Sequence, residues 1–316
     1  MDRQVVKPPF AYYGGKTTLA PIIAGLLPTH EHYVEPFAGS LAVLLGRPAF
    51  KGRRTETVND ADGLLVNVWR SIAWSPDETA KWCDWPVSEA DLSARHLWLV
   101  EHRAEVTARL QADPDWHDPK VAGWWLWGIC SWIGSGWCSG TGPWGRDGDR
   151  LTKGDAGRGI NRKIPHLGNA GRGVHRQPGA DLFGALTARL RDVRICNGDW
   201  SRVVTPSVTH RHGLTGVVLD PPYPDGFDPH GAYSGQTGDA WALWREVMAW
   251  ATEAGERPDM RVVVCGYDGL WTPPPGWRTV AWKAHGGYGS GNGNPERERL
   301  WCSPACLSGA QTGLFS

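Results

Sequence analysis

Short apolar runs alternate with longer amphipathic segments along most of the chain. Several of these runs are rich in β-branched residues and end in a polar or acidic residue, as buried strands of a parallel sheet do. The predicted strands are HYVEPFAG (32–39), TETVND (55–60), VRICNGD (193–199), GVVLDPPY (216–223), RVVVCGYD (261–268) and a last RLWCS (299–303). Because helical patterns separate most of them, we expect an α/β fold with a mostly parallel, doubly wound sheet.

Three segments have the periodicity of amphipathic helices. The segment 88–113 opens with Ser88 followed three residues later by Asp91, which is a capping-box signature, and continues as a long amphipathic pattern. Apolar residues also recur on one face of 180–192 and of 239–255. We expect a helix in each of these segments.

The strand pattern stops near residue 60 and resumes near residue 193. The interval contains a segment, 134–179, that is rich in Gly and basic residues and has no strong period. Long insertions of this kind are usually functional loops or disordered segments. We therefore predict one catalytic domain built from residues 1–74 and 180–316, with residues 75–179 inserted between its two parts.

Composition limits the possible functions only weakly. The 316 residues suffice for one large or two ordinary domains, and 33 Lys and Arg balance 33 Asp and Glu, so net charge argues neither for nor against a polyanionic partner. The sequence has no apolar run of about 18 residues and no signal-peptide core, which predicts a soluble protein with no membrane partner. The seven cysteines form no CxxC pair, so we expect no metal site.

The run TGVVLDPPYPDG (215–226) contains the most informative motif. Pro221 and Pro222 lack the N–H that a strand ladder needs, so the strand ends there. Asp220 and Tyr223 then lie at its carboxyl end, where open α/β sheets bind ligands. A carboxylate and the Pro221 carbonyl can accept both N–H bonds of an amine such as adenine N6, while the aromatic ring stacks on the base. The motif therefore predicts chemistry on a base amine.

Other predicted strands also end in carboxylates. Glu35 and Asp60 lie at the ends of two consecutive strands, and Asp199 follows a third in NGDW (197–200). Asp60 lies 21 residues after Gly39, about the spacing of the acid that accepts hydrogen bonds from ribose hydroxyls in nucleotide-binding folds. This acidic edge favours a ligand with hydroxyls, an amine and a positive centre, and disfavours a phosphate.

Five motifs occur in a characteristic order: FAYYGGK, VEPFAGS, VND, NGDW and LDPPY. Over nearly the whole chain they resemble the D12-class, or Dam-like, DNA adenine-N6 methyltransferases, particularly the phage-borne members. The resemblance implies a Rossmann-like S-adenosylmethionine-dependent methyltransferase sheet with helices on both faces and an inserted target-recognition region. It implies site-specific methylation of adenine N6 in double-stranded DNA after base flipping. It further implies a cytoplasmic location in a bacterium or a phage-infected host, and a role in restriction–modification or phage defence evasion.

The resemblance also implies roles for individual residues. Those matching cofactor-binding positions for S-adenosylmethionine are Tyr12, Lys16, Glu35, Pro36, Phe37, Gly39, Asp60 and Asp199. Those matching the catalytic motif are Asp220, Pro221, Pro222 and Tyr223. Within the first set, Asp60 would hold the ribose hydroxyls and Asp199 would contact the adenine end. Where the family usually has F-x-G-x-G, this chain has Phe37-Ala38-Gly39-Ser40-Leu41.

The basic Gly-rich segment occupies the place of the target-recognition region. From Arg146 to Arg176 there are eight Lys or Arg and two His against three Asp, and Arg dispersed among Gly can follow a phosphate backbone. In the Trp-rich stretch before it (121–140), we expect several rings to form the core of a helical region. The residues predicted to contact DNA are Arg158, Arg162, Lys163, Arg172 and Arg176.

The motifs leave alternatives open. Cytosine-C5 methylation is disfavoured, because enzymes of that class carry a nucleophilic Cys in a Pro-Cys pair that this sequence lacks. Cytosine-N4 methylation is chemically closer but typically uses SPPY. An RNA base N-methyltransferase would share the cofactor and the motif, and a non-catalytic DNA-binding protein would keep the basic loops without binding cofactor. The sequence determines neither the recognition site nor the oligomeric state, although a monomer is favoured.

Overall fold

A computed structural model of the chain describes eleven stretches that include most of the predicted elements. These are residues 6–12, 14–27, 30–47, 55–133, 137–138, 144–147, 150–153, 160, 182–224, 239–282 and 298–306. The five residues predicted to contact DNA lie outside them, so the description that follows concerns the α/β core, the helical part of the insertion and the strand-end motifs.

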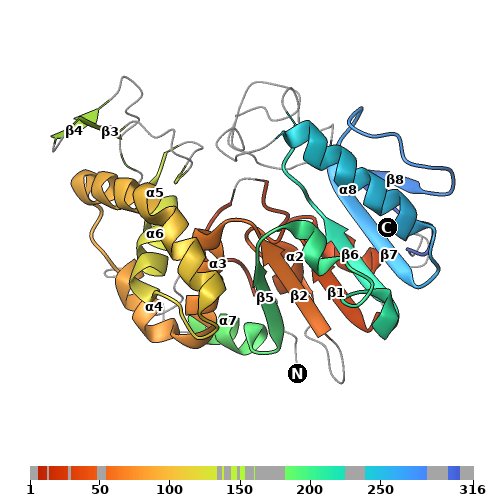
Figure 1. Cartoon of the computed structure of the whole chain (residues 1–316), viewed down its shortest axis with the longest axis horizontal. Coiled ribbons are helices and arrows are strands. Elements are labelled where there is room, and N and C mark those ends of the chain that lie inside the picture. The colour runs from red at the N-terminus through yellow and green to blue at the C-terminus, as the bar shows by residue number, and fades with distance from the viewer. Residues whose placement is uncertain are drawn as a thin grey trace.

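The centre of the fold is a mixed sheet of seven strands in the order β5-β2-β1-β6-β7-β9-β8 (Figure 1). The parallel strands are β1 (His32–Glu35), β2 (Thr55–Asp60), β5 (Val193–Asn197), β6 (Thr215–Leu219) and β7 (Met260–Tyr267). Antiparallel to them, β9 (Glu298–Cys302) pairs with β7 and with β8 (Arg278–Ala281). The six predicted strands are confirmed with adjusted bounds. The sequence did not predict β8, a short edge strand with no fully buried residue.

The order in which the chain adds strands to the sheet changes direction at the middle of the sheet, between β1 and β6. From β1 the chain passes outward through β2 to β5, and it then returns to β6, which pairs with the other side of β1. Two adjacent parallel strands whose connections leave in opposite directions create a crevice at their carboxyl ends, where ligands bind in open α/β sheets. The residues that follow β1 and β6 are therefore at the edge where the sequence predicts the site.

Helices pack around the sheet and beyond its β5 edge (Figure 1). They are α1 (Ala20–Leu26), α2 (Ala42–Gly46), α3 (Gly63–Trp74), α4 (Pro76–Cys83), α5 (Glu89–Ala112), α6 (Pro119–Ser131), α7 (Leu182–Leu190) and α8 (Ala240–Gly255). The predicted helices are confirmed as α5, α7 and α8. The Ser88 side chain accepts a hydrogen bond from the Asp91 N–H at 3.3 Å, as the capping signature predicted. The sequence analysis did not predict α3, in which nine of twelve residues are buried.

The helices of the insertion pack directly onto the α/β core. Helix α6 packs against both α3 and α4, and Leu99 of α5 shares one buried hydrophobic cluster with Val58 of β2. Trp125 and Trp127 of α6 are buried, as expected for part of the Trp-rich stretch. Further along lies a two-stranded antiparallel hairpin of β3 (Trp144–Asp147) and β4 (Arg150–Lys153). The predicted division of the chain into a catalytic domain (1–74 and 180–316) and an inserted region (75–179) stays a prediction.

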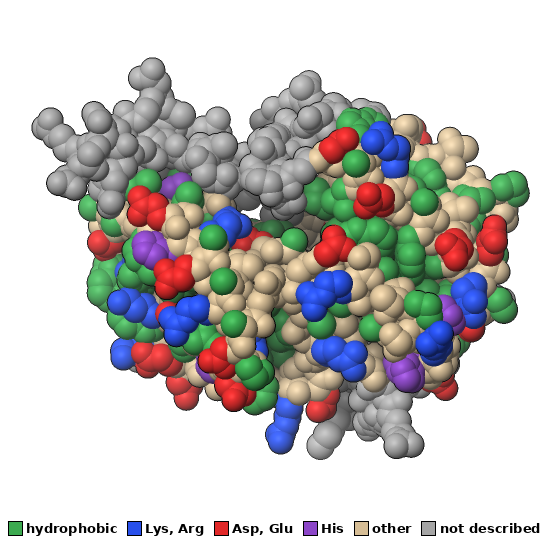
Figure 2. Space-filling view, in the orientation of Figure 1, with side chains coloured by type: hydrophobic (Ala, Val, Ile, Leu, Met, Phe, Trp, Pro, Cys, Tyr) green, Lys and Arg blue, Asp and Glu red, His purple; other side chains and the backbone are tan. Residues whose placement is uncertain are grey.

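The surface offers no obvious basic track among the described residues. Figure 2 shows acidic and basic side chains interspersed over the face in view, with the surface hollowed between the part that carries α5 and the part that carries α8. Within the described stretches, no helix has the combination of length and apolarity needed to cross a membrane. Contacts with a phosphate backbone would therefore have to involve other parts of the chain or the other face.

Candidate functional site

The turn after β1 is held tightly at the middle of the sheet. Gly39 has a positive φ of 49°, and a Cβ there would lie 3.1 Å from Cε1 of Tyr12, so the ring packs directly on the glycine. The Gly39 carbonyl accepts a hydrogen bond from the Trp69 indole at 2.9 Å, and its N–H donates to Asp60 Oδ2 at 2.9 Å. Leu41, which replaces the second glycine of the usual motif, is also left-handed, with a φ of 55°. Although Leu41 stands where the family usually has glycine, it adopts a left-handed backbone conformation that glycine favours.

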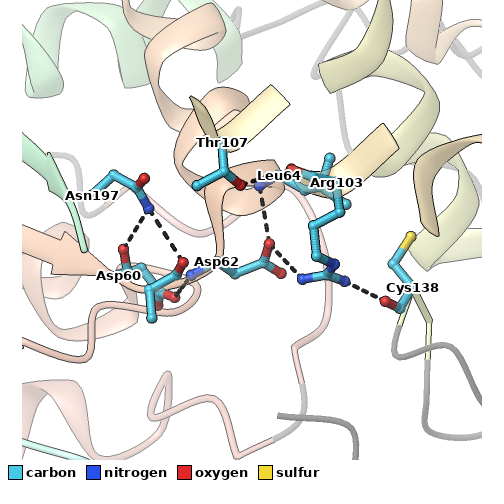
Figure 3. Close-up of polar contacts among 8 residues, drawn as sticks. Asp60, Asp62, Leu64, Arg103, Thr107, Cys138 and Asn197 are labelled. Carbon is cyan, nitrogen blue, oxygen red and sulfur yellow. Dashed lines mark hydrogen bonds and ion pairs between the residues drawn. The ribbon is translucent and has the colours of Figure 1, made fainter. Parts of the chain in front are cut away.

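Asp60 organises this turn from the end of β2. Its Oδ2 accepts the Gly39 N–H at 2.9 Å, and its Oδ1 accepts the Asp62 N–H at 2.9 Å (Figure 3). Burial raises the pKa of the Asp60 carboxyl to about 6, although backbone hydrogen bonds from Asp62, Gly39 and Ala61 oppose that rise. A carboxylate has about four lone-pair directions, so these three bonds leave about one for a further donor. The structure thus brings Asp60 and Gly39 together, and it leaves acceptor capacity for a ligand.

Asn59 joins the loops after β1 and β5, a role that sequence reasoning missed. Its Nδ2 donates to the Pro36 carbonyl and to the Gly198 carbonyl, both at 3.0 Å. The side chain is only 2% exposed, and its Oδ1 has no hydrogen-bond partner among the described residues. An Asn directly before the strand-end acid was the one available signal. The residue fixes the distance between the two loops that flank the predicted cofactor edge.

Phe37 and Asp199 lie on the two loops that Asn59 joins, which follow β1 and β5 at the predicted cofactor edge. The Asp199 side chain caps a short 3₁₀ helix, η2 (Trp200–Val203), by accepting the Ser201 N–H at 2.9 Å. The following Trp200 is buried and stacks on Phe37 with ring centroids 6.0 Å apart. The carboxylate of Asp199 is exposed at the edge, beside the loops that Asn59 joins. The structure therefore places it within the same group of loops as Pro36 and Gly39.

The catalytic motif forms a compact polar group with Lys16. The Lys16 Nζ lies 2.9 Å from Asp220 Oδ2 and 2.8 Å from the carbonyl of Gly14, which it also donates to. The Tyr223 hydroxyl donates to Asp220 Oδ1 at 3.3 Å and accepts from Lys16 Nζ at 3.4 Å. Lys16 was predicted among the cofactor contacts, and the structure places its amine on the carboxylate of Asp220, which was predicted to be catalytic. Its role toward the cofactor stays a prediction.

The surroundings of Lys16 keep it charged. Burial opposes the charge of its ammonium, but nearby Asp220, Tyr223, Cys265 and Glu298 together raise the pKa of Lys16 well above its ordinary value. Asp220 is the more accessible partner, with 24% of its side chain exposed against 7% for Lys16. The cation is therefore a permanent feature of the site, and the carboxylate is the member of the pair that a substrate can reach.

The ring of Tyr223 is packed among other aromatic side chains. It is 6% exposed and lies against Tyr267 at 4.8 Å and Trp244 at 6.3 Å between ring centroids. Both neighbours come from the β6–β7 side of the sheet, where α8 covers it (Figure 1). A flat base stacking on Tyr223 would have to approach from the side of Asp220.

Glu35 was predicted as a cofactor contact, but its hydrogen bond is made within the core. The buried carboxylate accepts the Tyr33 hydroxyl at 2.6 Å, and Tyr33 in turn lies under the Arg47 guanidinium. Arg47 and Arg189 both pair with buried Glu56, at 3.5 and 2.5 Å. Burial raises the pKa of Glu35 to about 7, although the Tyr33 hydroxyl and the arginines oppose that rise. Its contacts are those of a buried ionic cluster, and a cofactor role for Glu35 stays a prediction.

The remaining predicted residues divide into two groups. Pro221 is buried and Pro222 is partly buried, directly beside Asp220. The predicted DNA contacts Arg158, Arg162, Lys163, Arg172 and Arg176 lie outside the described residues. Among the residues that are described, no group of three or more His, Cys, Asp or Glu is placed to hold a metal ion.

Comparison with known families gives one match. Residues 12–89 match the family model of D12 class N6 adenine-specific DNA methyltransferases. The matched range includes Tyr12, the Gly39 turn and Asp60, while the Asp220 motif lies beyond it. No curated protein matches the chain.

Proposed function

We propose that the chain is a D12-class N6 adenine-specific DNA methyltransferase, which transfers the methyl group of S-adenosylmethionine to adenine N6 at a specific site in double-stranded DNA after base flipping. One observation carries the proposal. The Gly39–Asp60 turn and the Asp220 motif lie at the carboxyl ends of neighbouring parallel strands, on either side of the point where the strand order reverses.

The residues at the β1, β2 and β5 ends fit S-adenosylmethionine. The remaining lone pair of Asp60 suits a ribose hydroxyl, and the buried Oδ1 of Asn59 is an open acceptor between the loops. Tyr12, Phe37 and Asp199 offer aromatic and anionic contacts along the same edge. When bound, the cofactor supplies an electrophilic methyl group on a positively charged sulfur.

Asp220 would prepare the attacking nitrogen. Its carboxylate and the Pro221 carbonyl accept the two N–H bonds of the adenine amine, which turns the nitrogen lone pair toward the methyl group. While Asp220 and the Pro221 carbonyl hold the amine, its nitrogen would take the methyl group, and the electron pair of the bond that is lost would stay on the sulfur of the leaving group. The nitrogen becomes positively charged and acidic, and it then releases one proton to Asp220 or to water. This route needs no covalent enzyme intermediate, so none of the seven cysteines is required.

Lys16 would control how Asp220 meets this amine. The ammonium lies on Oδ2 of the carboxylate, whereas the contact that Oδ1 makes among the described residues is with the Tyr223 hydroxyl at 3.3 Å. The incoming amine would approach Oδ1, where it would replace or share this neutral contact. Tyr223 is largely buried beside the motif, and enzymes that do chemistry on a base generally take that base out of the duplex, which supports extrusion of the adenine.

A labelled-methyl assay tests the function directly. Purified protein is incubated with methyl-labelled S-adenosylmethionine and with either unmodified duplex DNA or structured RNA, and the labelled nucleoside is identified after digestion. We expect N6-methyl-2′-deoxyadenosine from DNA, and none with an Asp220→Asn variant. A Glu253→Gln variant removes an exposed carboxylate from the last turn of α8, before the chain enters the amino end of β7, and serves as the matched control. Label in RNA alone would favour the RNA methyltransferase, and failure to bind the cofactor by calorimetry would favour a non-catalytic DNA-binding protein.

A further inference from the structure

Asn59, the residue before Asp60 at the end of β2, bonds to the loops that follow β1 and β5. Its Nδ2 donates to the Pro36 carbonyl and to the Gly198 carbonyl, at 3.0 Å each. Because both neighbours are acceptors, the amide nitrogen and not its oxygen must face them. The two loops lie on opposite sides of β2 in the sheet, so one side chain joins them across the strand between them.

The place of these two carbonyls in the chain gives the contact its significance. Pro36 directly precedes Phe37, and Gly198 directly precedes Asp199. Since the peptide bond is planar, the carbonyl of one residue and the Cα of the next move as one rigid unit. Asn59 thus fixes the peptide planes that lead into Phe37 and Asp199, both of which are predicted to contact the cofactor.

Backbone contacts also attach these loops to the end of β2. The Asn59 carbonyl accepts the Ala38 N–H at 2.9 Å, and the Asp60 carbonyl accepts the Gly198 N–H at 3.1 Å. Asn197 Nδ2 donates to the same Asp60 carbonyl at 2.9 Å (Figure 3). Each of these bonds holds one loop, whereas the side-chain amide of Asn59 holds both loops at once.

The rings of Phe37 and Trp200 make a second contact between the two loops. They stack with their centroids 6.0 Å apart and their planes at 26°. Ring pairs are favourable over centroid separations of about 4.5–7 Å, whereas a hydrogen bond weakens steeply as its geometry changes. The two bonds from Asn59 therefore define the spacing of the loops more closely than the rings do.

We propose that Asn59 is a positioning residue that determines the affinity for the adenosine part of the cofactor. The inference rests on the proposed function, in which Asp60 and Asp199 bind the ribose and the adenine of S-adenosylmethionine. Asn59 acts through the two carbonyls and keeps Phe37 and Asp199 at a fixed spacing across β2. The loops then need little reordering when the cofactor binds, and avoiding that cost strengthens binding.

The effect should be confined to the cofactor. Asp220 and Lys16 meet at the end of β6, which pairs with the side of β1 away from β2. A site saturated with cofactor should therefore transfer methyl groups at close to the wild-type rate. A merely structural role gives the opposite result, because a smaller fraction of active protein lowers the apparent kcat and leaves KM unchanged.

Asn59→Asp is the sharpest test, because it keeps the shape of the side chain and an oxygen at Oδ1 but replaces the NH₂ group. A carboxylate has no N–H to donate, and a protonated carboxyl could donate to only one of the two carbonyls. We expect the Kd of S-adenosylhomocysteine, measured by calorimetry, to rise by about tenfold or more. The KM for S-adenosylmethionine with unmodified duplex DNA should rise equally, while kcat and the KM for DNA change by less than about threefold.

Asn67→Asp is the matched control. Asn67 of α3 is fully buried, donates through Nδ2 to the Asp118 carbonyl at 2.9 Å and accepts the Asp118 N–H at 2.8 Å. The same substitution there breaks a buried contact between an amide and the backbone at the start of α6, and not between the cofactor loops. It should lower the melting temperature and leave the Kd of S-adenosylhomocysteine within about twofold of the wild-type value.

The outcomes separate this inference from the proposed function. Wild-type Kd and KM in Asn59→Asp, or an equal rise of both constants in Asn67→Asp, would overturn the positioning role alone. If circular dichroism shows that Asn59→Asp does not fold, Asn59→Ala decides, because it removes both donors without adding a charge; unchanged constants in that variant overturn the role as well. A wild-type protein that binds no S-adenosylhomocysteine overturns the proposed function, and this inference with it.

Discussion

Asp60 and Asp220 both lie at carboxyl ends of parallel strands, but the structure holds them in different ways. Asp60 accepts backbone N–H groups of its own neighbouring loops, Gly39 and Asp62, at 2.9 Å each. Asp220 is held by the side chains of Lys16 and Tyr223. Backbone donors are fixed by the fold, whereas side chains can exchange partners. The first carboxylate is therefore suited to a preformed binding edge, and the second to a group that must accept a substrate.

The difference in charge strengthens this contrast. The donors to Asp60 are neutral, so burial raises the pKa of its carboxyl to about 6. Asp220 instead faces an ammonium whose own pKa is raised despite burial, because Asp220 and the other nearby groups favour its charged form. The two carboxylates therefore differ in the charge of their donors, which are neutral N–H groups at Asp60 and include an ammonium at Asp220.

The largest expected effect is the loss of Asp220. Asp220→Ala should lower the rate of methyl transfer by a factor of about 10² to 10⁴, because the amine loses the acceptor that orients its lone pair. Cofactor affinity should change by less than about threefold. Single-turnover transfer and calorimetry measure the two quantities. Substantial activity in this variant would remove Asp220 from the catalytic role.

Lys16 provides the control for that variant. Asp220→Ala leaves a buried ammonium without its carboxylate, which typically costs about 3–5 kcal/mol of stability. The double variant Lys16→Met, Asp220→Ala should recover most of the thermal stability and none of the activity. Recovery of activity in the double variant would mean that the single variant had lost its fold and not its chemistry.

The second effect concerns the preformed edge. Asp60→Ala leaves the Gly39 and Asp62 N–H groups without their acceptor and removes the predicted partner of the ribose hydroxyls. We expect cofactor binding to weaken by about 1–3 kcal/mol, roughly fivefold to 150-fold, together with a lower melting temperature. Calorimetry and thermal melts measure these changes. Wild-type cofactor affinity in Asp60→Ala would show that this carboxylate organises the turn without binding the ligand.

Glu35 is a third carboxylate at a strand end, and its burial is expected to affect the stability of the protein. Its folded-state pKa of about 7 lies above its ordinary value of 4.5, so the folded protein binds this proton more tightly than the unfolded chain. The stability that it contributes is present below pH 4.5 and is lost as the pH rises toward 7. Glu35→Gln should remove this loss and stabilise the protein at pH 8 relative to wild type by on the order of 2 kcal/mol. Urea unfolding at pH 5 and pH 8 measures the difference; an unchanged pH dependence would contradict it.

The smallest effect is expected at the Tyr223 hydroxyl. Tyr223→Phe loses the 3.3 Å contact with Asp220 but keeps the ring, so transfer should slow by less than about tenfold. Tyr223→Ala should be far more damaging, because base–aromatic stacking contributes roughly 1–3 kcal/mol per base. Single-turnover rates of the two variants make the comparison. Equal losses in both would assign the contribution to the hydroxyl.

Much of the fold was predictable, because its signals are local. The strands that end in Glu35, Asp60 and Asp220 have apolar runs that a buried sheet requires, and the cap of α5 depends on two residues three positions apart. Helix α3 and strand β8 were missed. Nine of the twelve residues of α3 are buried, and β8 is a short edge strand with alternating partial exposure.

The sequence by itself determined the α/β class and the strand ends that carry acids, since periodicity and motif spacing act over a few tens of residues. Only the tertiary structure decided which partners those acids have. Lys16 meets a carboxylate from the other half of the sheet, and Arg103 joins Asp62 to Cys138 through a helix of the insertion. Such contacts depend on how distant segments pack, and a buried charge takes its partner from whatever the packing brings within reach.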